Sequence, residues 1–95
     1  MKEQLKQIIE HYGVMKQLKY FQSEVFELSE AIIKYEYADD YMNDKFVLDI
    51  AQEIADVEVM LNQFKEYYNI KDKPIEDIMK FKIDRQLERI KNEEK

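Results

Sequence analysis

Apolar residues recur along this 95-residue chain at the three- and four-residue spacing of amphipathic helices. One stripe comprises Val14, Leu18, Phe21, Val25, Leu28, Ile32 and Tyr35, and a second comprises Val47, Ile50, Ile54, Val57, Leu61, Phe64 and Tyr68. The strong structure breakers are Gly13 and Pro74. The pattern predicts an all-α chain, with helices over residues 2–11, 14–34 and 45–68 and a fourth from Pro74 onward. We expect a four-helix bundle-like protomer with two long paired helices.

The ends of the predicted helices carry recognisable cap residues. Asn43 or Asp44 is expected to cap the third helix after the connection over residues 35–43. Pro74 is expected at the first position of the fourth helix, with Asp72 or Lys73 near its cap. That helix is expected to turn five apolar residues toward the core, namely Ile75, Ile78, Met79, Ile83 and Ile90.

A further apolar row in the second helix lies off the main stripe and comprises Met15, Phe26 and Ile33. Burial against a second subunit would remove this row from water and predicts a homo-oligomer. The alternative is that the first or fourth helix covers the row within the same chain.

Length and composition narrow the class of protein. A chain of this length forms one domain, residues 1–95, and the absence of cysteine excludes disulfides and thiolate metal sites. The net charge of −6 argues against a nucleic-acid polymer as partner. No apolar run is long enough for a membrane span, so we expect a cytoplasmic protein without membrane contact.

Two acidic pairs stand at matching places on the two long helices. Glu24 and Glu27 border the first stripe, and Glu53 and Asp56 border the second at the same angular offset, whereas Glu30 and Glu58 are expected to point away. Four carboxylates facing one another at the edge of a core repel unless a cation neutralises them. The pattern predicts a site for a hard divalent metal, and oxygen ligands suit Mg²⁺ or Mn²⁺. The alternative is an ordinary charged rim on solvated helices.

Three cations, Lys82, Arg85 and Arg89, gather along one edge of the predicted fourth helix. They could clamp phosphates, or they could form a solvated helix face that balances nearby acids.

These residues together resemble the MazG-like all-α nucleotide pyrophosphohydrolases. The resemblance rests on Tyr12-Gly13 with Gln17, Glu24-x-x-Glu27-Leu28 with Ala31-Ile32, Glu53-Ile54-Ala55-Asp56-Val57, and residues 82–89. It implies that the four acids bind magnesium, that the last helix contacts phosphates through Lys82, Arg85 and Arg89, and that the protein is a homodimer or homotetramer. Asp84 and Gln86 stand where the family often has an asparagine.

The resemblance implies hydrolysis of a nucleoside triphosphate to the monophosphate and pyrophosphate. Water is the expected nucleophile, and we assign Glu24 as the carboxylate that orients or deprotonates it. The alternative function is a non-catalytic helical interaction or regulatory module, which would neither bind magnesium tightly nor hydrolyse a nucleotide.

Overall fold

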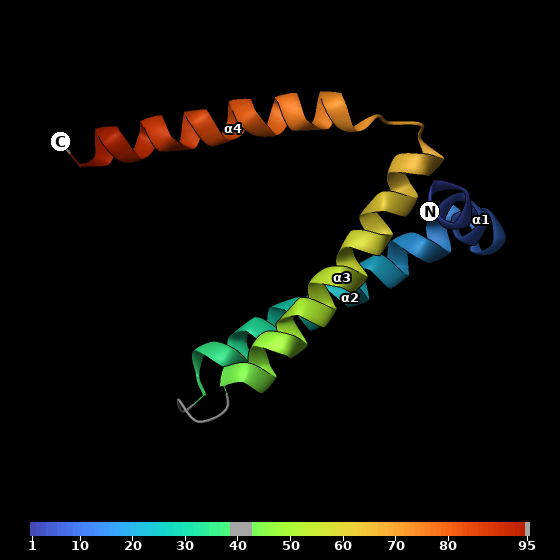
Figure 1. Ribbon diagram of the computed structural model, residues 1–95, viewed down its shortest axis with the longest axis horizontal. Helices are drawn as coiled ribbons and strands as arrows, with labels where there is room; N and C mark the ends of the chain where they lie inside the picture. Colours follow the sequence, from blue (N-terminus) through green and yellow to red (C-terminus); the bar gives the residue numbers. More distant parts are fainter. Residues whose placement is uncertain (39–42, 95) are drawn as a thin grey trace.

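The computed structural model describes residues 1–38 and 43–94 of the chain (Figure 1). Four α-helices account for nearly all of them: α1 (Lys2–Tyr12), α2 (Val14–Glu36), α3 (Asn43–Tyr67) and α4 (Asp72–Glu93). These helices confirm the all-α prediction, with bounds within a few residues of those expected.

Single residues with unusual backbone angles end two of the helices. Gly13 separates α1 from α2 with φ 88° and ψ 148°, a region that only glycine adopts readily. Asn69 has φ 55° after the end of α3. The amides of Asn69 and Ile70 donate to the carbonyls of Glu66 and Lys65, at 3.2 and 2.8 Å, which is the Schellman pattern of a helix C-terminus.

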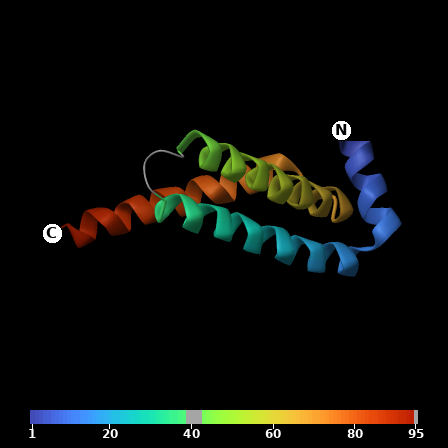
Figure 2. The ribbon, with the colours of Figure 1, turned by 90° about the horizontal axis from the view of Figure 1, so that it is seen from below.

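The two long helices, α2 and α3, run antiparallel side by side and form a hairpin (Figure 2). Phe21 of α2 meets Phe64 of α3 edge to face, with ring centroids 5.6 Å apart. The short helix α1 packs mainly on α3. Its Leu5 and Ile9, together with Met60 of α3, are the buried apolar residues of the described chain.

The side of α2 that faces α3 is shifted from the predicted stripe. Its buried or half-buried positions are Val14, Gln17, Phe21, Glu24, Leu28, Ala31 and Tyr35, a seam with the 3.5-residue repeat of paired helices. Leu18, Val25 and Ile32 remain exposed on its flank. The expectation that Glu24 lies on the border was therefore wrong, because Glu24 lies in the seam itself.

The fourth helix does not join the packed part of the chain (Figure 1). Only Ile75 is half-buried, while Ile78, Met79, Ile83 and Ile90 are exposed. The expectation that these residues face the core of the same chain was wrong, because α4 leaves the end of α3 at an angle and meets it only at its first turns.

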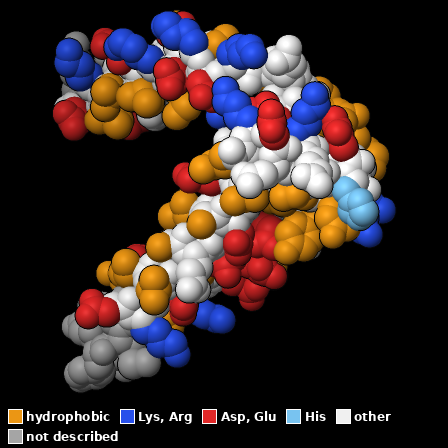
Figure 3. Space-filling view, turned by 45° about the vertical axis from the view of Figure 1, so that its right-hand side comes forward, with side chains coloured by type: hydrophobic (Ala, Val, Ile, Leu, Met, Phe, Trp, Pro, Cys, Tyr) orange, Lys and Arg blue, Asp and Glu red, His pale blue; other side chains and the backbone are white. Residues whose placement is uncertain are grey.

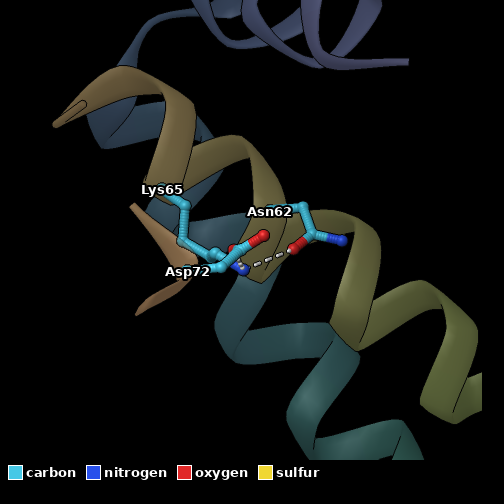
Figure 4. A network of polar contacts seen from close by, with 3 residues as sticks. All are labelled: Asn62, Lys65 and Asp72. Atoms are coloured by element: carbon cyan, nitrogen blue, oxygen red, sulfur yellow. Dashed lines mark hydrogen bonds and ion pairs between the residues drawn. The ribbon is translucent and has the colours of Figure 1, made fainter. Parts of the chain in front are cut away.

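An ion pair holds the start of α4 to the end of α3 (Figure 4). Lys65 Nζ lies 2.6 Å from an oxygen of Asp72 and donates to Asn62 Oδ1 at 3.3 Å. The Lys65 ammonium lowers the pKa of the Asp72 carboxyl. Helix α4 begins at Asp72 with Lys71 as its N-cap, so Pro74 stands at the third helical position and not at the first. A proline is tolerated there because the first amides of a helix lack intrahelical acceptors.

The prediction that Asn43 or Asp44 caps α3 was wrong, because the helix already includes Asn43. The residue before it lies outside the described residues.

The further apolar row of α2 is open to solvent in the single chain. Met15, Phe26 and Ile33 are all exposed, and neither α1 nor α4 covers them. Within residues 1–38 and 43–94, no helix combines the length and apolar character that crossing a membrane requires.

Candidate metal centre

Three of the four predicted carboxylates come together where α2 and α3 face each other. Each of Glu24, Glu27 and Glu53 offers an oxygen, and these oxygens lie within 4.8 Å of one another. Glu24 is only 5% exposed, Glu53 is half-buried and Glu27 is exposed. Figure 3 shows acidic side chains gathered on one side of the hairpin.

The buried oxygens of this cluster lack hydrogen-bond partners. One carboxylate oxygen of Glu24 and one of Glu53 are buried without any donor. Burial raises the pKa of both carboxyls, and the charges of Glu27 and Asp56 raise them further. The Tyr20 hydroxyl partly offsets the rise at Glu24, while Glu24 in turn raises the pKa of Tyr20.

The fourth predicted ligand, Asp56, is exposed and lies outside the group of closest oxygens. It nevertheless borders the same cavity as Glu24, and its charge acts on both Glu24 and Glu53. Asp56 is therefore part of the acidic environment, at its exposed edge.

Glu30 is exposed and is not among the converging carboxylates, although it borders a groove near them. Glu30 lines a groove with Glu27 and Glu53 on the far side of the cluster, because it follows Glu27 by about one helical turn. Asp49 lines the same groove and raises the pKa of Glu53. Glu58, by contrast, lies near the base of α4 and away from the cluster, as expected.

A cavity of about 720 Å³ opens beside Glu24 and Asp56, between α1, α2 and α3. Tyr12 and Tyr20 supply aromatic faces to its lining, and Lys16, Lys19 and Ser23 supply polar groups. Its inner end is a buried amide pair, in which Gln17 Nε2 donates to Gln63 Oε1 at 2.9 Å. This volume is typical of a small-molecule site.

Lys16 and Lys19 are the functional candidates that the sequence did not single out. Both line the cavity that holds Glu24, and the Lys16 ammonium also lies 5.3 Å from the centre of the Tyr12 ring. A helical projection from Glu24 back to Tyr20 and Lys16 at four-residue steps would have indicated Lys16, whereas Lys19 lies off that row.

The predicted phosphate clamp lies elsewhere in the single chain. Lys82, Arg85 and Arg89 are exposed on α4, which does not pack on α2 or α3. The Arg85 guanidinium lies 5.7 Å from the centre of the Phe81 ring on its own helix. One protomer therefore does not bring these cations to the carboxylates.

The donor set fits a hard divalent cation. All the converging groups are carboxylate oxygens, which suit Mg²⁺ or Mn²⁺. Two of them are buried and unpartnered, which is costly unless a cation compensates. Glu24, Glu27 and Glu53 are the residues that would hold such an ion, with Asp56 at the edge.

Comparisons of the chain with protein-family models, with curated proteins and with solved structures found no match. The resemblance to the MazG-like family rests on the motif residues alone and stays a prediction.

Proposed function

We propose that the chain is a magnesium-dependent nucleoside triphosphate pyrophosphohydrolase, which releases a nucleoside monophosphate and pyrophosphate. The observation that carries the proposal is the pair of buried, unpartnered oxygens of Glu24 and Glu53, beside a cavity lined by tyrosines and lysines. Buried carboxylate oxygens without hydrogen-bond donors are better explained by a site for a metal ion that binds a phosphate substrate than by an ordinary solvated surface.

The cavity offers a place for each part of such a substrate. Tyr12 and Tyr20 present aromatic surface on which a base can stack. Lys16 and Lys19 can contact phosphate oxygens near the carboxylates. Mg²⁺, when bound, neutralises the polyphosphate and polarises the phosphorus under attack.

We assign Glu24 as the carboxylate that orients or deprotonates the attacking water. Burial raises the pKa of Glu24, and a base with a raised pKa accepts a proton more readily near neutral pH. Tyr20 lies beside it and limits the orientations of the carboxylate. Glu27 and Glu53 then act mainly as metal ligands.

The deciding experiment incubates the protein with Mg²⁺ and a panel of nucleoside triphosphates and separates pyrophosphate from orthophosphate. We expect pyrophosphate and the monophosphate, and loss of both in Glu24→Gln. The matched control is Glu58→Gln, which removes a charge from the other side of α3 and should hydrolyse as the wild type does. Release of orthophosphate and a diphosphate would refute the proposed cleavage.

A second comparison locates the phosphate contacts. If Lys16 and Lys19 supply them, Lys19→Ala should raise KM while Arg85→Ala and Arg89→Ala leave it unchanged. If the arginine variants are the ones impaired, the cations of α4 reach the substrate, which requires α4 of another copy because α4 stands apart in its own chain.

The alternative proposal is a non-catalytic helical interaction module, in which the carboxylates form a charged rim. Calorimetric titration with Mg²⁺ separates the two, since a module should bind no metal tightly and hydrolyse no nucleotide in the panel.

A further inference from the structure

The single chain exposes far more surface than a compact protein of its size. Its accessible area is 8099 Å², about 2,200 Å² more than the roughly 5,900 Å² expected for a compact monomer of this mass. Its radius of gyration is 17.1 Å, whereas a compact domain of this length has about 12 Å. The folded chain therefore leaves a large part of itself uncovered.

Part of the uncovered surface is one side of the hairpin, which we call its apolar face. It consists of Leu18, Val25 and Ile32 on α2 and Val47, Ile54 and Leu61 on α3, all exposed. Each set recurs every seven residues on the flank of the seam away from the acids. Because α2 and α3 are antiparallel, their acidic flanks share one side and their apolar flanks the opposite side.

Helix α4 carries a matching row of apolar residues. Ile75, Met79, Ile83, Leu87 and Ile90 recur at three- and four-residue steps on one side of the helix. The row begins in a groove of about 480 Å³ that is lined by Ile75 and Met79 together with Leu61 and Phe64 of α3. The apolar face of the hairpin thus continues onto α4, and hydrophobic side chains line both arms where they face each other (Figure 3).

The charges of the two arms are complementary. Helices α2 and α3 together carry ten acidic and five basic side chains. Residues 80–91 of α4 carry five basic and two acidic side chains. This difference in charge favours attraction between residues 80–91 and a hairpin at long range, although the carboxylate cluster itself lies on the side away from the apolar face. The helix's own hairpin lies out of reach along most of its length.

We propose that two copies of the chain clasp each other, with α4 of each packed along the apolar face of the partner's hairpin. Covering the excess surface in both chains would bury about 4,400 Å² in total, which is within the range of obligate homodimers. The clasp leaves the carboxylate cluster and its cavity open, because they lie on the other side of the hairpin. The proposal does not depend on the proposed function.

Single substitutions in the two surfaces test the clasp by sedimentation. Ile54→Glu in the apolar face and Ile83→Lys in the α4 row place charges in the proposed contact, so each should convert a wild-type dimer to monomer. Leu48→Glu and Phe81→Lys are the matched controls, since both residues are exposed and lie about 120° and about 160° around their helices from Ile54 and Ile83. The controls should remain dimers.

Mixing the two monomeric variants identifies which surfaces meet. In the clasp, a heterodimer of Ile54→Glu with Ile83→Lys has one contact that carries both charges as an opposite pair and one contact that is wild-type. Native mass spectrometry should therefore find heterodimers where neither variant dimerises alone, and circular dichroism should show helix regained on mixing if the monomers unfold.

Three outcomes would overturn the proposal. If the wild-type protein is a monomer at high concentration, the proposed dimer does not form. A dimer that survives Ile83→Lys excludes α4 from the contact. Failure of the mixture to form heterodimers, when each variant alone is monomeric, indicates α4–α4 or hairpin–hairpin pairing in place of the clasp.

Discussion

Glu24 and Glu53 occupy positions that an isolated helical hairpin would fill with apolar side chains. Each holds one buried oxygen that no donor reaches, and the neighbouring acids add repulsion. An unpaired buried charge is costly, so the metal-free chain carries a destabilising feature at this point. The positions make physical sense if a cation shares the site.

Removing one of these charges should stabilise the metal-free protein and abolish its function. We expect Glu53→Gln to raise the melting temperature in chelator, because it relieves a like-charge cluster, and to lower hydrolysis by about 100-fold or more. Calorimetry and a pyrophosphate assay measure the two effects. Glu58→Gln should change neither, and full activity of Glu53→Gln would contradict the metal-site assignment.

The raised pKa values set the direction of the pH dependence. The pKa values of Glu24 and Glu53 are above the ordinary 4.5 in the folded chain, so the folded state binds more protons than the unfolded state above that pH. Its free energy of unfolding should therefore fall as pH rises through the raised pKa values. Asp72, whose pKa is lowered, acts in the opposite direction only at more acidic pH.

Thermal unfolding in chelator between pH 5 and 8 checks this dependence. We expect the melting temperature to fall with rising pH, and added Mg²⁺ to flatten the curve by stabilising the ionised carboxylates. A melting temperature that rises steadily over the same range, with Glu53→Gln behaving as the wild type does, would refute the assignment of the effect to this cluster.

At the scale of elements, a buried amide pair joins the two long helices. Gln17 and Gln63 are both buried and hydrogen-bonded to each other. Gln17→Met should cost about 1–3 kcal/mol, because it leaves the buried Gln63 Oε1 without its hydrogen-bond donor. The double variant with Gln63→Met should cost less than the sum of the single variants. Urea denaturation measures all three, and simple additivity would show that the pair is not coupled.

The helices themselves could be predicted from the sequence because their signals are local. Amphipathic spacing places α1 to α4, and Gly13 marks a boundary because its backbone angles exclude other residues. The convergence of Glu24, Glu27 and Glu53 also followed from spacing, since equal offsets on paired helices bring side chains to one side.

The remaining errors concern how the helices pack, which spacing does not determine. Glu24 was placed on a border because the apolar stripe was read at 3.6 residues per turn, whereas the contact with α3 follows a 3.5-residue seam that includes Glu24. The apolar row of α4 was assigned to the core because an apolar stripe predicts that one face of a helix is buried, but not which surface covers it. The cavity and its lysines depend on where α1 crosses α2 and α3, which is a tertiary feature.

At the scale of the whole molecule, the chain separates its two surfaces. The carboxylates and the cavity lie on one side of the hairpin, and the apolar face with the α4 row lies on the other (Figure 3). Pairing through the apolar side therefore does not obstruct a ligand at the acidic side. The proposed pairing would also place most of the missing hydrophobic core between chains, since only three apolar residues of the described chain are buried.

A core shared between two chains makes thermal stability depend on protein concentration. Unfolding of a dimer yields two chains, so a 100-fold increase in concentration stabilises it by about 2.7 kcal/mol. For a dimer of this size the melting temperature should rise by roughly 5–10 °C. Circular dichroism melts over that concentration range measure the shift. Phe81→Lys should show the same slope, and Ile83→Lys should show none and melt lower. A wild-type melting temperature independent of concentration would mean that each chain is stable alone, with its apolar face and α4 row open to water.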